Sequence, residues 1–214
     1  MSPAAASRLP LHAYTAGRVD VFLETERLVL RRFTMDDLEA IVELDRDPDV
    51  MRYISGGLAT PREEIASDIL PAWLGYYARF DSYGFWAAHA KRSGEFLGWF
   101  HFRPPPAHEP NDVELGYRLR KSAWGKGYAT EGSRALIAHG FTIGRVQRVF
   151  ASAMVVNTAS WRVMEKAGLK FVRIVHGQGP RLVDGDEHGE IEYALTRAEW
   201  EAQQLALGRQ HSRG

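Results

Sequence analysis

A glycine-rich turn between a strand-like run and a helix-like run constrains the fold more than any other feature of this sequence. Residues 113–120 have the composition of a strand, and apolar residues in 129–141 recur three, four and seven positions apart, as on one face of a helix. Residues 146–152 then form a second apolar, β-branched run. A strand, a helix and a strand in this order are typical of a crossover between parallel strands. The middle of the chain therefore predicts a sheet with at least one parallel pair.

The remaining segments predict antiparallel strands and further helices. Apolar runs flank the Ser93–Gly94 turn, which predicts a hairpin, and the proline-rich residues 103–112 predict a loop. Helix start signals include a capping box at 60–63 and a cap at Asn157. We therefore expect a mixed α/β fold with helices flanking a sheet of about seven strands, which are 28–33, 85–90, 96–102, 113–120, 146–152, 169–175 and 190–195.

Length and charge limit the number of domains and the kinds of partner. The chain has 214 residues, and we expect a flexible leader over 1–22, a single domain over 23–207 and a disordered tail over 208–214. Twenty-seven Lys and Arg residues balance 27 Asp and Glu residues, so no general attraction to nucleic acid or to an anionic membrane is expected. The chain contains no cysteine and no apolar run of about 18 residues or more. We expect a cytoplasmic protein.

The glycine-rich turn itself can carry chemistry. Glycines at 125 and 127, just before a helix, allow backbone N–H groups to converge on an anion such as a phosphate, and the helix dipole adds to the attraction. A tight turn with close helix packing explains the same glycines, so both interpretations stay open. The segment is neither a P-loop nor a Rossmann fingerprint. Lys126 either meets a phosphate or is a solvated turn residue.

Several motifs in one order make the sequence resemble a known family. This chain is similar to the GNAT superfamily of acyl-CoA-dependent N-acyltransferases, and within it to the Rim-type acetyltransferases of ribosomal-protein N-termini. The resemblance covers about residues 24–196. The motifs that carry it are the segments 26–31, 48–53 (a turn), 113–117, 124–131 and 157–171.

The resemblance implies a mostly antiparallel, splayed sheet with acetyl-CoA between the strands at 113–119 and 146–152. The main chain around Leu115, Tyr117 and Leu119 would pair with the pantetheine arm. The pyrophosphate would sit on the backbone N–H groups of the turn, and the residues implied are Gly125, Lys126, Gly127, Tyr128, Ala129 and Thr130. Asn157 would be a cofactor-side hydrogen-bonding residue, although asparagine is also a preferred helix N-cap. No metal is expected, because the eight histidines are not spaced or clustered as metal ligands are.

Two residues are candidates for catalysis. Glu114, on the strand that lines the cleft, would remove a proton from the attacking amine, unless it lies on a solvated strand face. Many family members have a tyrosine acid where this chain has Met164, and Gln or Arg where it has Trp124. Methionine cannot protonate a thiolate, so Ser160 becomes the candidate donor. A serine at the third position of a helix is otherwise unremarkable.

The implied reaction is direct attack of a primary amine on the thioester in a ternary complex, without an enzyme-bound acyl group. A protein N-terminal α-amine is the first acceptor to consider. A small amine such as an antibiotic, a polyamine or an amino acid is the alternative, and a non-catalytic CoA-binding sensor is an alternative of another class. The oligomeric state stays open, and the resemblance allows a homodimer. Aromatic residues at 73, 76, 86 and 99 either line an acceptor pocket or, as we favour, form core.

Overall fold

The computed structural model describes residues 20–106, 108–177 and 183–211. Its eight strands form one mixed sheet in the order β1-β2-β3-β4-β5-β6-β8-β7. The strands are β1 Val21–Glu24, β2 Leu28–Arg32, β3 Gly84–Ala90, β4 Phe96–Arg103, β5 Asp112–Leu119, β6 Arg148–Met154, β7 Lys170–Val175 and β8 Glu190–Thr196. The helices are α1 Leu38–Asp45, α2 Pro48–Ser55, α3 Arg62–Glu64, α4 Leu70–Tyr77, α5 Tyr128–Thr142, α6 Thr158–Lys166 and α7 Arg197–His211.

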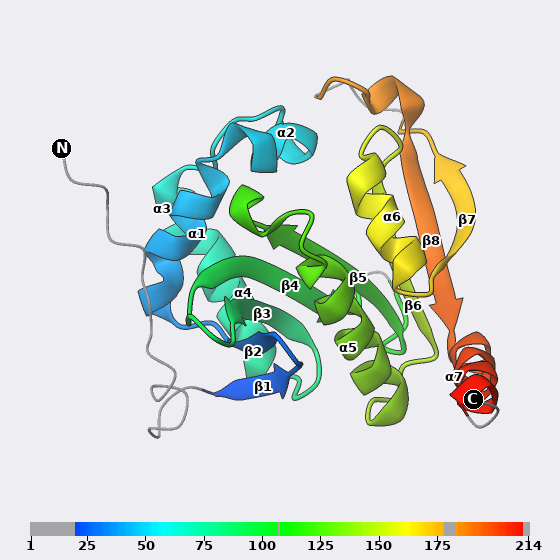
Figure 1. The fold of residues 1–214 in the computed structure, drawn as a ribbon. Helices are drawn as coiled ribbons and strands as arrows, with labels where there is room; N and C mark the ends of the chain where they lie inside the picture. Colours follow the sequence, from blue (N-terminus) through cyan, green and yellow to red (C-terminus); the bar gives the residue numbers. More distant parts are fainter. Residues whose placement is uncertain (1–19, 107, 178–182, 212–214) are drawn as a thin grey trace.

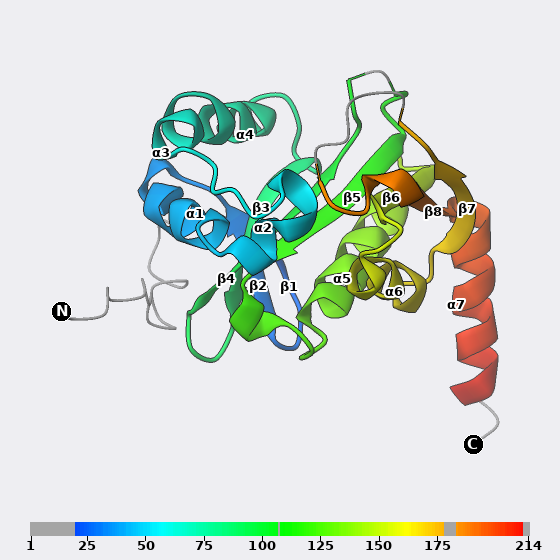
Figure 2. The same ribbon diagram turned by 90° about the horizontal axis from the view of Figure 1, so that it is seen from above.

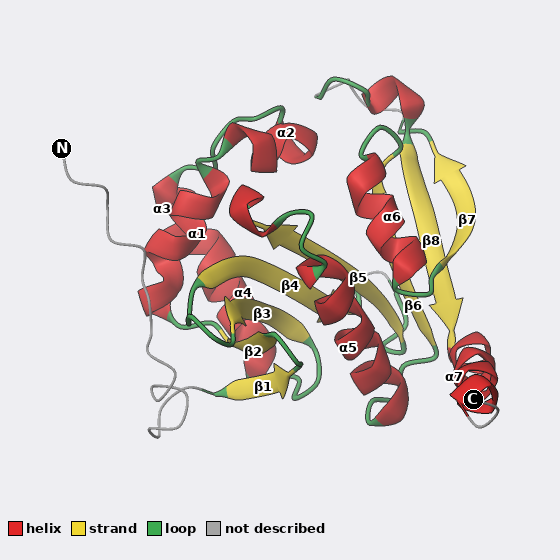
Figure 3. Cartoon of the chain, viewed as in Figure 1, coloured by secondary structure: helices red, strands yellow, loops and turns green. Residues whose placement is uncertain are grey.

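Helices cover both faces of the sheet (Figures 1 and 2). One apolar core lies between α5, α6 and the sheet and includes Phe100, Leu136 and Met164. A second core on the other face joins α1 and α4 to the first half of the sheet, through residues such as Ile41 and Trp73. Figure 3 shows the resulting order of layers, with the strands between the two groups of helices. Such a sheet is buried on both faces in its first half.

The sheet parts in its middle. Among the eight described strands, only β5 and β6 pair in parallel, and their register covers only Asp112 to Glu114 against Arg148 to Phe150. Beyond Glu114, β5 continues to pair with β4 on its other side, and β6 continues to pair with β8. The edges of β5 from Leu115 and of β6 from Ala151 therefore face each other without strand pairing. This splayed pair confirms the expected sheet geometry.

All seven expected strands and the mixed, mostly antiparallel sheet are confirmed, but two elements were not anticipated. The sheet has an eighth strand, β1, and its residues Val21 and Phe22 fall in the segment expected to be a flexible leader. Residues 48–53, expected to form a turn, belong to helix α2, because Asp47 caps the helix by accepting from the Asp49 N–H. The same Asp47–Pro48 pair thus ends one helix and begins the next.

Chain ends and helix starts also differ in detail from expectation. Helix α7 continues to His211, so residues 208–211 are helical, while residues 1–19 and 212–214 lie outside the described part. The capping box expected at 60–63 is wrong, since the Thr60 hydroxyl instead donates to Asp45 at 2.7 Å and α3 has no side-chain cap. The cap at Asn157 is confirmed, since its side chain accepts from Ser160 N, and Thr196 caps α7 in the same way, with Oγ1 accepting from Glu199 N.

Helix α5 packs on β4 so closely that a side chain at Gly132 is excluded. A Cβ there would lie 2.4 Å from Cζ of the buried Phe100. We expect Gly132→Ala to lower the free energy of unfolding by about 1–2 kcal/mol, because overpacking outweighs the gain in helix propensity. Gly75→Ala on α4 is the matched control, since a Cβ there meets no atom within 4 Å. Urea denaturation measures both variants, and equal stability would contradict this packing argument.

Candidate functional site

The turn between β5 and α5 presents a row of free backbone donors. Gly125 and Gly127 have φ of 70° and 82°, which lets the chain turn sharply into the helix. Within the described part of the chain, no group accepts a hydrogen bond from the N–H groups of residues 125–130. The first intrahelical bond comes only at Glu131 N, which donates to Gly127 O at 3.0 Å. Six consecutive free N–H groups at a helix start are an arrangement that can bind an anion.

The turn is anchored to the end of β5. The indole N–H of Trp124 donates to the carbonyl of Leu119 at 2.8 Å. This bond ties the side chain of Trp124 to the strand that precedes the turn. It also occupies the Leu119 carbonyl, which was expected to be free for the pantetheine arm. The edge of β5 that is not paired with β6, and is available to such an arm, begins at Leu115.

Glu114 lies at the point where β5 and β6 part. It is directly opposite Arg103 on β4 and Phe150 on β6 in the strand register. Its carboxylate is 3.1 Å from the Arg103 guanidinium, and the side chain is 24% exposed. Burial raises the pKa of Glu114 above its usual value, although the charge of Arg103 opposes the shift. The strand face that carries Glu114 is therefore only partly exposed to solvent, and a carboxylate made more basic in this way can act as a general base.

Ser160 lies on α6, bonded to Tyr117. The Tyr117 hydroxyl donates to the Ser160 carbonyl at 2.7 Å and lies 3.1 Å from Ser160 Oγ. Burial raises the pKa of Tyr117 to about 12, so the phenol stays protonated. Tyr117 was expected to act through its main chain, but its side chain joins β5 to α6 across the parted strands. Asn157 sits at the start of the same helix and is engaged as its N-cap.

Glu114 and Ser160 lie on opposite faces of the sheet. Successive side chains of a strand point to opposite faces, and Tyr117 packs with the core under α5 and α6. Glu114 instead lies with Arg103 and His101, whose ring contacts Phe85 and Trp99 of the core under α1 and α4. The opening between β5 and β6 therefore has a carboxylate on one side and a hydroxyl on the other.

The contact between His101 and Glu114 could not be predicted from the sequence. The Nε2 of His101 lies 3.6 Å from Glu114 Oε2 and is buried without a hydrogen-bond partner among the described residues. Burial, with the charges of Arg103 and Arg118, lowers the pKa of His101 to about 3, so the ring is neutral. Only the register that sets His101 opposite Gly116 reveals this contact. A side chain at position 116 would collide with the ring, where a Cβ would lie 2.5 Å from Nε2.

The structure also places the aromatic residues and the lysine that the sequence singled out. Trp73, Trp86 and Trp99 are buried, which confirms them as core. Lys126 is exposed and has no side-chain partner in the described part of the chain. Among the described residues no group of three or more His, Asp or Glu side chains is placed to hold a metal ion. In the same residues, every helix is too short or too polar to cross a bilayer.

Comparison with known proteins agrees with this geometry. The family model "Acetyltransferase (GNAT) domain" matches residues 27–170. Over 185 residues, the chain is 32% identical to an "FsC-acetyl coenzyme A-N(2)-transacetylase" of Aspergillus fumigatus, covering 83% of this chain and 77% of the relative. A GNAT acetyltransferase structure from Bacillus anthracis aligns with a TM-score of 0.68 at 26% identity, covering 83% and 99% of the two chains.

A structure of RimL, a ribosomal-protein alpha-N-acetyltransferase in complex with coenzyme A, shows the same fold. Its TM-score is 0.69 at 19% identity, and the alignment covers 83% of this chain and 98% of RimL. The match of the family model spans the splayed strands, the glycine turn, α5 and α6. This chain therefore belongs to the GNAT family of acetyl-CoA-dependent N-acetyltransferases.

Proposed function

We propose that this enzyme transfers an acetyl group from acetyl-CoA directly to a primary α-amine. Acetyl-CoA supplies the activated acetyl thioester. The N–H groups of residues 125–130 bind its pyrophosphate, and the free edge of β5 from Leu115 aligns the pantetheine arm. Glu114 accepts the proton that the amine loses, and Ser160 Oγ donates a hydrogen bond to the departing sulfur.

The placement of Glu114 and Ser160 on opposite faces of the opened sheet carries this proposal. In a direct transfer, the amine approaches the carbonyl carbon from one side as the sulfur leaves. A base on the side of approach and a donor beside the leaving group are what that reaction needs. The described residues provide one group for each role.

The basicity of Glu114 favours an α-amine over a lysine side chain. An α-amine has a pKa of about 8 and a lysine one of about 10.4, so the α-amine is already partly free at neutral pH. A carboxylate, even with a raised pKa, deprotonates the less basic ammonium more readily. A protein N-terminus is the first acceptor that meets this condition.

A small molecule with an α-amine is a second candidate, and a specific comparison favours it. The relative from Aspergillus fumigatus carries the name of an N(2)-transacetylase and shares more sequence identity with this chain than RimL does. The likeness to RimL, at 19% identity, supports the fold and not the acceptor. Both candidates use the same cofactor site and the same base.

Release of free thiol from acetyl-CoA tests the reaction and the acceptor together. The panel consists of N-terminal peptides, their Nα-blocked forms with a free lysine, free amino acids and polyamines. We expect release with unblocked peptides or amino acids and little with blocked peptides. Preference for the lysine side chain would contradict the α-amine. CoA binding without release for any amine would contradict the enzyme and support a sensor.

Ser160→Ala is expected to slow turnover about tenfold, the usual worth of one hydrogen bond to a charged group. The bond from Tyr117 goes to the Ser160 carbonyl and survives the change, so the fold should be kept. The loss should shrink with an acetyl thioester whose thiol is more acidic and needs less help to leave. Steady-state kinetics with both thioesters measure the effect. An undiminished rate would leave Ser160 with a structural role only.

A further inference from the structure

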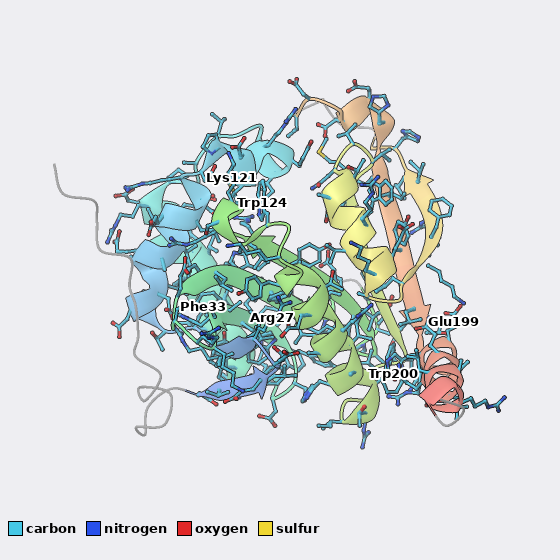
Figure 4. The ribbon with its side chains drawn as sticks, in the orientation of Figure 1. Arg27, Phe33, Lys121, Trp124, Glu199 and Trp200 are labelled. Carbon is cyan, nitrogen blue, oxygen red and sulfur yellow. The ribbon has the colours of Figure 1, made fainter. Side chains whose placement is uncertain are left out.

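The turn between β1 and β2 contacts the glycine turn from a distant part of the sequence. Arg27, which lies beside the start of α5 (Figure 4), donates through Nη1 to the carbonyl of Lys126 at 2.9 Å. Its guanidinium also lies over the ring of Tyr128, 4.8 Å from the centroid. These contacts join segments about a hundred residues apart, so they shape the turn only in the folded protein.

Glu131 holds Arg27 in that position. Its carboxylate accepts from Arg27 Nε at 2.6 Å and from Arg27 N at 2.8 Å, and it also accepts from the Thr25 hydroxyl at 2.5 Å. Burial raises the pKa of Glu131, but the hydrogen bonds from Thr25 and Arg27 outweigh it and lower the pKa. Glu131 is thus ionised, and the positive charge of Arg27 balances its negative charge. This balance matters because Glu131 lies in the first turn of the helix that would bind the pyrophosphate.

Peptide geometry links this contact to the free donors. A trans peptide is planar, with its C=O and N–H pointing in opposite directions. Because the Lys126 carbonyl points toward Arg27, the Gly127 N–H of the same peptide points away from it. That N–H has no acceptor among the described residues. The direction of the Lys126–Gly127 peptide therefore decides whether this donor is available to a ligand.

The same peptide is free to flip in the absence of a restraint. Gly127 has φ of 82° and ψ of 0°, the conformation of the third residue of a type II turn. Reversing the preceding peptide converts such a turn to type I, and glycine accepts both forms. In the reversed form the Lys126 carbonyl would face the ligand and repel a phosphate.

We infer that Arg27, anchored by Glu131, is a positioning residue for acetyl-CoA that holds the Gly127 N–H toward the pyrophosphate. This inference rests on the proposed pyrophosphate site of residues 125–130. Arg27 acts through the peptide rather than by its own charge. Lysine cannot replace it, because an ammonium cannot bond to Glu131 and to the Lys126 carbonyl in the geometry of a guanidinium fork.

Kinetics with two acetyl donors test the positioning role. We expect Arg27→Lys and Arg27→Gln each to raise the KM for acetyl-CoA about tenfold, the effect of losing about one charge-assisted hydrogen bond, with kcat within about twofold. With acetyl-pantetheine, which lacks the pyrophosphate, both variants should match the unaltered enzyme. The control is Arg62→Gln, which breaks the exposed ion pair with Glu39 on α1 and should change neither KM. An equal loss with both donors would overturn the inference.

Glu131→Gln separates positioning from direct charge attraction. If Arg27 bound a phosphate itself, removal of the Glu131 charge would strengthen CoA binding, as measured by calorimetry. If Glu131 anchors Arg27, CoA binding should weaken about as much as in Arg27→Gln. Tighter binding, or full affinity in Arg27→Lys, would therefore overturn the inference. If the Arg27 variants bind normally while Gly127→Glu does not, only the inference fails. If both bind normally, the proposed pyrophosphate site fails as well.

Discussion

Gly127→Glu should reduce the affinity for CoA by more than about a hundredfold, since it places a carboxylate among the N–H groups that bind the pyrophosphate. The reason is both steric and electrostatic. A Cβ at this position lies 3.3 Å from Arg27 Nη2, and the new carboxylate can compete with Glu131 for that guanidinium. Two changes thus act together: the anion site gains a negative charge, and the restraint on the Lys126–Gly127 peptide is lost. Isothermal titration calorimetry with CoA measures the affinity.

Backbone strain must be separated from this effect. The φ of 82° at Gly127 costs any other residue roughly 1–2 kcal/mol, and part of the change in stability will come from that source. Gly57→Glu is the matched control, because Gly57 has φ of 89°, only ordinary contacts around a Cβ, and a place between α2 and α3. Both variants should unfold at similar temperatures, and only Gly127→Glu should lose CoA. Retained affinity in Gly127→Glu would exclude this turn as the pyrophosphate site.

Glu114→Gln should lower kcat/KM by about two to three orders of magnitude, the usual worth of a positioned general base. The ratio of the two kcat/KM values should be largest above the pKa of Glu114 and below that of the amine, where the base is ionised, the amine arrives protonated and water is a poor substitute for the base. The same ratio of kcat/KM values should decrease toward pH 9, where most of the amine is already unprotonated. Because the pKa of Glu114 is raised, the acid limb of the unaltered enzyme should lie above the ordinary range of a glutamate. A constant ratio across the pH range would remove Glu114 from this role.

Stability measurements distinguish a lost base from a damaged fold. A carboxyl whose folded pKa is raised contributes stability below its unfolded pKa and loses it as the pH rises through the folded pKa. At a pH where Glu114 is ionised, its charge is therefore a cost to the fold, and Glu114→Gln should unfold there at the same temperature as the unaltered enzyme or slightly higher. Glu64→Gln, at an exposed position on α3, is the kinetic control and should retain full activity.

Part of this site depends only on local chemistry. The turn at Gly125 and Gly127, the cap at Asn157 and the left-handed Gly168 after α6 each depend on residues a few positions apart. Backbone sterics and capping act over such short separations, so their residue types are recognisable in the sequence. Helix α2 was missed for a related reason, since Asp47 and Pro48 are equally good signals for an end and for a start.

What the sequence determined by itself was the order of the seven strands from β2 to β8, the position of the glycine turn, and the resemblance to the family. Tertiary structure alone decided that Glu114 and Ser160 face opposite sides of the opening, that His101 lies beside Glu114, and that Arg27 restrains a turn about a hundred residues away. The physical reason is the range of the interactions. A one-residue change in strand register moves every side chain to the other face of the sheet, and no local signal specifies the partners of Arg27. Those partners exist only once β1, β2 and α5 have packed together.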